Sequence, residues 1–269
     1  MKKVRVLVLR TAGTNCDKET AFAFEEAGAA TRLVHINRLS SGELELSNYQ
    51  ILAIPGGFSY GDDIASGKIL ANELKYGIEK DVQKFIRDGK LIIGICNGFQ
   101  ILVKSGLLPN LSGDFKTIET TLTLNDSAKF EDRWVYLKNV QSAENGVQSK
   151  CAWTQGINDI IYLPVAHGEG KFIPKDKNTL AQLKKNGLVV FEYVDEKGSR
   201  RGFPYNPNGS VENIAGICDK TGRVFGLMPH PERHISFLQH PRWTRQMKRG
   251  RGDGFAIFKN GVDFAKKHL

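Results

Sequence analysis

The stretch from Leu91 to Gln100 constrains most strongly how this chain can fold. Its first part, Leu-Ile-Ile-Gly-Ile, predicts a short strand buried on both faces, as in the centre of a parallel sheet. Cys96 follows at once, and the residues from Asn97 onward can begin a helix. The spacing of Gly94, Cys96 and Gly98 is typical of a nucleophile elbow, a sharp strand-to-helix turn that needs small residues beside a strained one.

Cys96 allows two interpretations at this point. In the first it is a catalytic thiolate, which the free N–H groups and the dipole of the following helix would stabilise. In the second it is a small buried core residue, because free cysteine is among the most buried residue types. The elbow spacing makes the first interpretation worth pursuing along the rest of the chain.

The first half of the chain alternates strands and helices. Strands are expected at 4–9, 31–36, 50–54 and 91–95, and helices at 17–28 and 68–88. This order predicts a mostly parallel open sheet with helices on both faces. In the second half, short strands with few helices between them predict an antiparallel extension of the sheet, at 120–124, 134–137, 160–165, 188–193, 214–218 and 224–228.

Length and composition indicate one globular domain over residues 1–269, ending in a basic loop and a helix at about 235–269. Neither a signal sequence nor a run of about 18 apolar residues is present, so we expect a cytoplasmic protein without membrane contact. The 4 cysteines lack any C-x-x-C spacing, which favours reduced thiols. The net charge of +9 is concentrated in the loop at 242–251, but no nucleic-acid-binding motif surrounds it, so a solvated loop or a docking surface is expected there.

Two glycine-rich stretches have the composition of binding loops. The first, Gly61–Lys68, lacks the spacing and the hydroxyl residue of a phosphate-binding P-loop, so we do not expect nucleotide binding there. The second is Pro55-Gly56-Gly57, where Gly57 can direct its N–H into a cleft because no side chain blocks a close approach. With the N–H of Asn97 it would form an oxyanion hole, although an ordinary tight turn is also possible.

A thiol nucleophile requires a base, and His230 is the best candidate. It follows an apolar strand-like run and lies between two prolines, which keep it out of a helix. Glu232 can accept a hydrogen bond from the imidazole and fix its tautomer. A metal site at His230 and His234 is not expected, because Pro231 interrupts their helical spacing and no third ligand is evident. His167 either lines the site or is a polar turn residue.

Taken together, these motifs resemble the class I, or triad, glutamine amidotransferases. The resemblance is closest to the glutaminase subunits of phosphoribosylformylglycinamidine synthases. It extends over nearly the whole chain through these blocks: Thr14-Asn-Cys-Asp17, Pro55-Gly-Gly-Phe-Ser-Tyr-Gly-Asp62, Gly94-Ile-Cys-Asn-Gly-Phe-Gln100, Ala166-His-Gly-Glu-Gly170, Tyr205-Asn-Pro-Asn-Gly-Ser210 and Met228-Pro-His-Pro-Glu-Arg233. The basic stretch after Arg233 departs from small subunits of this type and resembles the tail of a longer form.

The resemblance implies a flavodoxin-like fold and a triad of Cys96, His230 and Glu232 that hydrolyses the side-chain amide of glutamine. It implies that ammonia passes to a synthase large subunit, assembled with a small bridging subunit, and that ATP and Mg²⁺ bind at the synthase and no cofactor or metal at this chain. It further implies glutamine-binding roles for Gln100, His167, Asn206, Asn208, Gly209 and Ser210. Alternatives are a glutaminase that serves another synthase, a stand-alone cysteine γ-glutamyl hydrolase, and a non-catalytic subunit.

Overall fold

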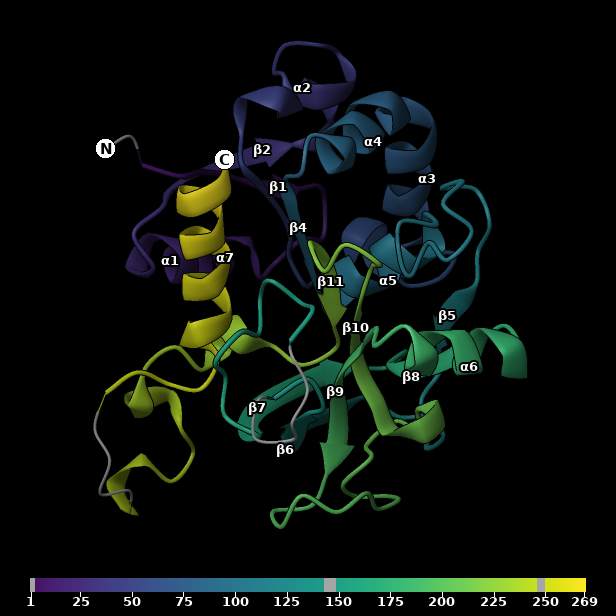
Figure 1. Cartoon of the computed structure of the whole chain (residues 1–269), viewed down its shortest axis with the longest axis vertical. Helices are drawn as coiled ribbons and strands as arrows, with labels where there is room; N and C mark the ends of the chain where they lie inside the picture. The colour runs from purple at the N-terminus through teal and green to yellow at the C-terminus, as the bar shows by residue number, and fades with distance from the viewer. Residues whose placement is uncertain (1–2, 143–148, 246–249) are drawn as a thin grey trace.

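The centre of the molecule is a sheet of parallel strands that continues into an antiparallel part (Figure 1). The computed structural model describes residues 3–142, 149–245 and 250–269. Its helices and strands, in chain order, are β1 (Arg5–Arg10), α1 (Asp17–Glu26), β2 (Ala30–His35), α2 (Ile36–Ser40), β3 (Ile51–Ile54), α3 (Lys68–Gly77), α4 (Glu79–Arg87), β4 (Leu91–Ile95), α5 (Asn97–Lys104), β5 (Thr120–Thr123), β6 (Glu131–Asn139), β7 (Ile160–His167), β8 (Lys171–Pro174), α6 (Lys177–Lys185), β9 (Val189–Val194), β10 (Ile214–Cys218), β11 (Val224–Leu227) and α7 (Phe255–His268).

The parallel part of the sheet has the order β2-β1-β3-β4-β11. This is the flavodoxin-like order, in which the chain reverses direction across the sheet between β1 and β3. Strands β3, β4 and β11 are buried along their whole length, as their nearly continuous apolar sequences predict. The expected open α/β sheet is therefore confirmed, and its carboxyl ends form a single edge.

The antiparallel extension continues the sheet in the order β10-β9-β6-β7. Although β7 is the last strand in this order, it returns to the carboxyl edge of the parallel strands, where the N–H of His230 donates to the carbonyl of Pro164 at 2.8 Å. A separate two-stranded sheet, β5–β8, supports the turn that follows β7, because the N–H of Asn125 donates to the carbonyl of Gly168 at 2.9 Å. The extension thus supplies one wall of the region above the parallel strands.

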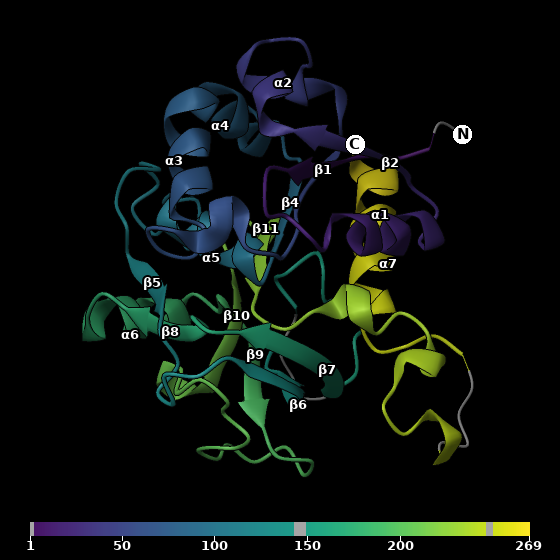
Figure 2. The ribbon, with the colours of Figure 1, turned by 180° about the vertical axis from the view of Figure 1, so that it is seen from behind.

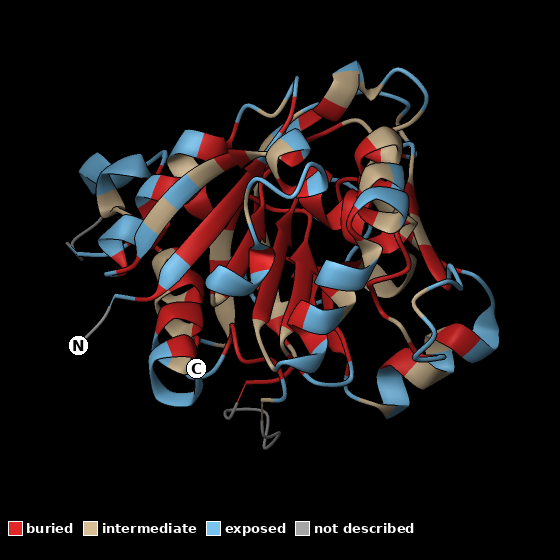
Figure 3. Ribbon diagram, turned by 90° about the horizontal axis from the view of Figure 1, so that it is seen from above, coloured by how far each residue is buried: buried red, intermediate tan, exposed pale blue. Residues whose placement is uncertain are grey.

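Helices cover both faces of the parallel sheet, and the buried residues lie between them (Figure 3). On one face α1 and α7 lie side by side (Figures 1 and 2), where Phe24 of α1 packs edge-on against Phe258 of α7 with 4.9 Å between ring centroids. On the other face α5 packs against β4, β3 and β11, and α3 packs against α5. None of the helices in the described part of the chain is long and apolar enough to cross a membrane.

The structure corrects two expectations about secondary structure. The single helix expected at 68–88 is wrong, because α3 ends at Gly77 and α4 begins at Glu79. Glycine is a poor helix former, and Ile78 leaves the helical conformation with φ −133° while its side chain stays buried. Strand β8 and helix α6 were not expected from the sequence. Helix α6 begins at Lys177, and the carboxylate of Asp176 caps it by accepting from the N–H of Thr179 at 2.7 Å.

The loop between the last strand and α7 projects from one corner of the molecule (Figure 2). The end that leads into α7 is anchored, because Asp253 accepts a hydrogen bond from the N–H of Tyr162 at 2.8 Å and Arg251 pairs with Glu26 at 2.7 Å. Two of the basic residues noted in the sequence, Lys248 and Arg249, lie outside the described residues.

Candidate active site

Neighbouring parallel strands bring the predicted site residues to one edge of the sheet. Strands β1, β3, β4 and β11 are followed by Thr11–Cys16, Pro55–Gly57, Cys96 and Met228–Glu232, respectively. Their carboxyl ends surround a cavity of about 210 Å³. The residues that line it are Asn15, Cys16, Gly57, Phe58, Cys96, Phe130, Asp132, Ala166, His230 and Arg233. Cys96 and His230, which are far apart in the sequence, therefore meet in one pocket.

Cys96 lies at a strained turn between β4 and α5. Its φ of 52° and ψ of −106° are outside the regions that L-residues ordinarily occupy. A side chain at Gly94 would lie 2.5 Å from the carbonyl oxygen of Gly98, and one at Gly98 would collide with the backbone of Ile54. The elbow predicted from the spacing is confirmed, and it places the thiol at the N-terminus of α5, where a thiolate is favoured.

His230 and Glu232 form a buried pair at the end of β11. The two side chains are 2% and 1% exposed, and His230 Nδ1 lies 2.6 Å from Glu232 Oε1. His230 Nε2 has no hydrogen-bond partner in the described part of the chain, so it is left to face the pocket. Burial alone would lower the pKa of His230, but the Glu232 carboxylate and the nearby thiols of Cys96 and Cys16 raise it well above its ordinary value.

Gly56 and Gly57 allow the groups of the pocket to approach one another. A Cβ at Gly56 would lie 2.8 Å from His230 Cε1 and 3.4 Å from Cys96 Cβ, so only a glycine fits between the imidazole and Cys96. Gly57 has φ 140°, and a Cβ there would lie 2.7 Å from the N–H nitrogen of Asn15. Within the described residues, neither the N–H of Gly57 nor that of Asn97 donates a hydrogen bond, so both donors are available.

The structure adds a second thiol, Cys16, to which the sequence analysis gave no role. Its Sγ lies 4.0 Å from His230 Nδ1 and accepts a hydrogen bond from the guanidinium of Arg233 at 3.1 Å. The signals in the sequence were its position in the turn after the first strand and its place in the block Thr14-Asn-Cys-Asp17. Burial raises the pKa of the Cys16 thiol, with a partly opposing effect from its contact with His230.

Cys16, His230 and Glu232 also present a set of atoms that could ligate a metal ion, with their ligand atoms within 4.8 Å of one another. The adjacent guanidinium of Arg233 opposes a cation at this position, because like charges repel strongly where water is excluded. His234, which the sequence analysis considered as a ligand, faces elsewhere: its Nδ1 lies 2.8 Å from the carbonyl of Tyr162.

Gln100, predicted to bind glutamine, belongs to a network beside the pocket. Its Nε2 donates to the carbonyl of Glu169 at 2.6 Å, and its Oε1 accepts from Asn97 Nδ2 at 3.0 Å. Asn97 Nδ2 also lies 3.2 Å from Asp62 Oδ1, and its Oδ1 accepts from the N–H of Ser59. This network joins the loop after β3, the start of α5 and the turn after β7.

His167 is buried in a polar cluster in which its partners are amides. Its Nδ1 lies 3.2 Å from Asn125 Oδ1, and Asn208 Nδ2 lies 3.4 Å from its Nε2. Asn125 Nδ2 donates to two carbonyl oxygens, which fixes its amide orientation and identifies His167 as the neutral form with its proton on Nδ1. Burial, with a smaller effect of the nearby His230, lowers the pKa of His167 to about 3.

The remaining predicted glutamine-binding residues hold the same wall together. Asn206 Oδ1 accepts from the N–H groups of Gly209 and Ser210 at 3.1 and 3.2 Å. Ser210 Oγ donates to Asn208 Oδ1 at 2.7 Å and accepts from the N–H of Phe172 at 3.0 Å. None of these residues, nor Gln100 or His167, lines the 210 Å³ cavity, so their contact with glutamine stays a prediction.

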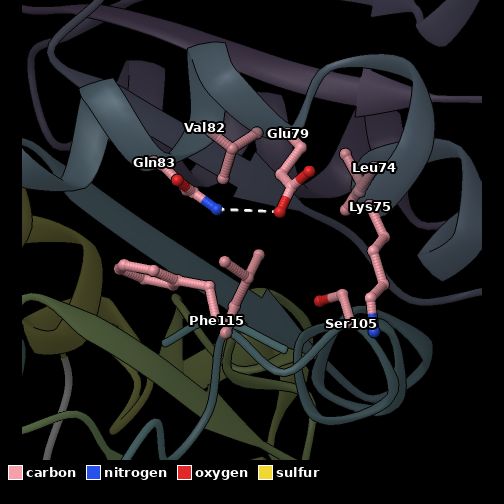
Figure 4. Close-up of a pocket in the computed structure, with 8 residues that line it drawn as sticks. Leu74, Lys75, Glu79, Val82, Gln83, Ser105 and Phe115 are labelled. Carbon is pink, nitrogen blue, oxygen red and sulfur yellow. Dashed lines mark hydrogen bonds between the residues drawn. The ribbon is translucent and has the colours of Figure 1, made fainter. Parts of the chain in front are cut away.

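A second pocket lies away from these groups, between the α3–α4 pair and the loop that contains Phe115 (Figure 4). Its volume is about 10 Å³, and Glu79 and Gln83 hydrogen-bond to each other across one wall at 2.9 Å. That volume is no larger than a single water molecule requires, so this pocket offers no room for a substrate.

Known proteins are similar to this chain over nearly its whole length. The PurQ subunit of phosphoribosylformylglycinamidine synthase from Dehalococcoides mccartyi is 49% identical in sequence to this chain, and the match covers 99% of this chain and 100% of that subunit. The corresponding subunit of Methanococcus maripaludis is 44% identical over 98% of each chain. A chain in the structure of PurLQS from Thermotoga maritima is 32% identical and superposes with a TM-score of 0.73, covering 98% of this chain and 99% of that one.

The model of the CobB/CobQ-like glutamine amidotransferase domain matches residues 3–265. The expected family is therefore confirmed by this match and by the similarity to the PurQ subunits. This chain belongs to the CobB/CobQ-like glutamine amidotransferase family.

Proposed function

We propose that this chain is the glutaminase subunit of a phosphoribosylformylglycinamidine synthase. It hydrolyses L-glutamine to glutamate and supplies ammonia for the ATP-dependent conversion of formylglycinamide ribonucleotide to its amidine in purine synthesis. The observation that carries the hydrolysis is the convergence of Cys96 and the His230–Glu232 pair on one pocket. The assignment to this synthase is supported by the PurQ subunits, which match nearly the full length of the chain.

Cys96 acts as the nucleophile and His230 as the base. Glu232 holds the Nδ1–H of His230, so Nε2 takes the thiol proton and later returns it to the leaving ammonia. The resulting thiolate at the N-terminus of α5 attacks the amide carbon of glutamine. Loss of ammonia leaves a glutamyl thioester on Cys96, which water hydrolyses with His230 again as the base.

The oxyanion that forms during each step is held by the N–H groups of Gly57 and Asn97. Both donors are free in the described chain: Gly57 lines the pocket, and Asn97 directly follows Cys96. Loss of one such donor typically costs about 10²–10³-fold in rate.

Cys96 suits the role of nucleophile better than the second thiol, Cys16. The Cys16 sulfur faces His230 Nδ1, which is already bound to Glu232, so this nitrogen is not available as a base. Cys16 is also held by Arg233 and by Asn15, whose Oδ1 lies 3.2 Å from its Sγ.

Glutamine is held between the pocket and the wall formed by the turn after β7. Six residues act mainly by fixing that wall: Gln100, His167, Asn206, Asn208, Gly209 and Ser210. Their hydrogen bonds join the loop after β3, the start of α5 and the turn at 205–210. The backbone groups of Ala166–Gly170 then face the substrate.

The synthase partner covers the mouth of the pocket and carries ATP and Mg²⁺. Phe58 and Phe130, 45% and 51% exposed, lie with ring centroids 6.1 Å apart and both line the pocket, which is typical of a surface that a partner buries. The likeness to a chain of PurLQS supports a large and a small partner subunit.

The glycine-rich loop at 61–67 of this chain does not suit a nucleotide. A phosphate would need the N–H groups of Gly67 and Ser66, but these already donate to the carboxylates of Asp62 and Glu169.

The decisive experiment uses the assembled complex with Cys96→Ala. Glutamine-dependent synthesis should fall to background, while synthesis from added ammonium should continue at the wild-type rate, which also serves as the folding control. Glutamine hydrolysis at the wild-type rate in the variant complex would overturn the proposal.

A glutamine-analogue electrophile separates the remaining alternatives. Mass spectrometry should find it on Cys96, with faster labelling in the presence of the synthase partner. Full glutaminase activity without any partner would indicate a stand-alone γ-glutamyl hydrolase, and the absence of labelling under both conditions would indicate a non-catalytic subunit.

A further inference from the structure

Arg233 and Cys16 form a connected group beside the His230–Glu232 pair that the hydrolysis described above does not use. Arg233 Nε donates to Glu19 Oε1 on α1 at 2.8 Å, and its Nη2 donates to Cys16 Sγ at 3.1 Å. Cys16 is anchored in turn, because its N–H donates to the carbonyl of Gly56 at 3.2 Å. The guanidinium is therefore fixed from two sides, with the Cys16 sulfur between it and the imidazole.

The buried pair has a charge that the catalytic groups cannot balance among themselves. A thiolate and an imidazolium cancel, but the carboxylate of Glu232 remains negative and is 1% exposed. Its Oε2 has no hydrogen-bond partner within the described residues. An uncompensated buried carboxylate is costly, so a nearby positive charge is needed to keep it ionised.

Arg233 is the cation that Cys16 holds beside this carboxylate: its Nη2 lies 3.1 Å from Cys16 Sγ, and that sulfur lies within 4.8 Å of a carboxylate oxygen of Glu232. Burial would lower the pKa of Arg233, but the nearby Cys16, the contact with Glu19 and the charge of Glu232 raise it. The Glu19 carboxylate that also pairs with Arg233 is 38% exposed and screened by water, so the guanidinium still provides positive charge beside the buried carboxylate of Glu232.

We propose that Arg233, held in place by Cys16 and Glu19, is a positioning residue whose positive charge offsets the buried Glu232 carboxylate and thereby maintains the Cys96 thiolate and the His230 imidazolium. This inference rests on the proposed glutaminase reaction. Arg233 acts through Glu232 and does not itself contact the reacting atoms.

Other groups face these residues and must be considered in a pH experiment. The ionisable side chains that face the cluster are Glu19 of α1, Asp132 of β6, His167 of β7, Tyr193 of β9 and Cys16. Burial lowers the pKa of His167 to about 3 and raises that of Tyr193 and of Cys16, so these three keep their neutral forms near neutral pH.

The test compares Arg233→Gln with Arg233→Lys in the assembled complex. The first readout is the rate at which iodoacetamide, a neutral electrophile, alkylates Cys96 as a function of pH without glutamine, followed by mass spectrometry of the Cys96 peptide. Removing the positive charge disfavours the thiolate, so the acid limb of the Arg233→Gln profile should move up by about one pH unit, equivalent to tenfold in the ionisation equilibrium. Arg233→Lys should restore most of the shift, because it retains the charge.

Steady-state kinetics give the second readout. The kcat of Arg233→Gln should fall about tenfold while KM for glutamine changes by less than about threefold, since the guanidinium contributes to the chemistry and not to substrate binding. An unchanged alkylation profile together with a KM raised tenfold or more would mean that Arg233 binds glutamine directly, and it would overturn the proposal.

Arg10 provides a matched control. Its side chain is 44% exposed against 38% for Arg233, and it also pairs with a carboxylate, that of Asp17 at 3.3 Å, but it makes no contact with Cys16. Arg10→Gln should leave both the acid limb and kcat unchanged. A shift as large as that of Arg233→Gln would show that general surface charge controls the thiolate, contrary to the proposal.

Variants of Cys16 test the same idea without altering the arginine. Cys16→Ala removes the sulfur that holds Nη2, so the acid limb should move in the same direction by a smaller amount, and Cys16→Ser should restore it because a hydroxyl can also accept from Arg233. An unshifted limb in a folded Cys16→Ala complex counts against the proposal even if Arg233→Gln does not assemble. The glutaminase assignment is tested separately by labelling of wild-type Cys96 with the glutamine analogue. Loss of that labelling contradicts the assignment, whereas normal labelling with unshifted variant profiles contradicts only the role of Arg233.

Discussion

Two buried histidines, His230 and His167, lie close to each other but in regions with opposite chemistry. They are 2% and 3% exposed, and each follows or ends a strand. His230 has a carboxylate at Nδ1, and its pKa is raised, whereas His167 has an amide oxygen at Nδ1, and its pKa is lowered to about 3. Burial is common to both, so the partner atom decides which histidine can take up a proton.

The comparison teaches that depth in the molecule does not identify a catalytic base. Burial disfavours the charged imidazole in both regions, and only a fixed negative charge reverses the effect. The region of His230 is therefore suited to proton transfer, and the region of His167 to holding a rigid wall.

The largest expected effect comes from making the two regions alike. Glu232→Gln replaces the carboxylate by an amide, as at His167, and glutamine-dependent activity of the complex should fall by about 10²–10⁴-fold, the range that general acid–base catalysis contributes. Ammonia-dependent synthesis should be unchanged. Glu43→Gln, which removes an exposed carboxylate paired with Arg38, is the control and should retain full activity. Near wild-type activity in Glu232→Gln would break the comparison.

The reverse exchange gives the second effect. Asn125→Asp places a carboxylate at His167 Nδ1, so the pKa of His167, measured by NMR titration of its imidazole, should rise from about 3. Folding stability should fall by about 1–3 kcal/mol, because the carboxylate would face the carbonyl oxygens to which Asn125 Nδ2 now donates. An unchanged titration of His167 would show that the partner atom is not decisive.

The third expected effect is a pH dependence of stability, which involves no change in activity. Folding lowers the pKa of His167, so its imidazole stays neutral in the folded state. In the unfolded chain the same imidazole takes up a proton below its ordinary pKa of 6.5. The contribution of His167 is therefore complete above pH 6.5 and is lost as the pH falls toward 3.

Urea unfolding of wild type and His167→Gln at several pH values tests this directly. The difference between their free energies of unfolding should change by about 1.4 kcal/mol per pH unit below the ordinary pKa. His268→Gln, at the exposed end of α7, is the control and should give a much weaker dependence. Parallel curves for wild type and His167→Gln would contradict the neutral assignment.

Much of the fold could be predicted because its signals are local. The apolar run of β4, the glycines around Cys96 and the alternation of strands with helices each reflect sterics within a few residues. The helix at 68–88 was less predictable, since its apolar stripe continues through Gly77 and Ile78 although the backbone breaks there. Periodicity reports which face is buried, and it does not report a break that keeps the same face inside.

By itself the sequence determined the strand ends that carry Cys96, Gly57 and His230, because a parallel sheet brings its carboxyl ends to one edge. It also determined the pairing of His230 with Glu232, since the two are only two residues apart. Only the tertiary structure decided that Cys16 and Arg233, which are 217 residues apart in the chain, join this pair, and that His167 is neutral. The charge state of a buried group depends on atoms that distant segments bring to it, and no local pattern encodes those atoms.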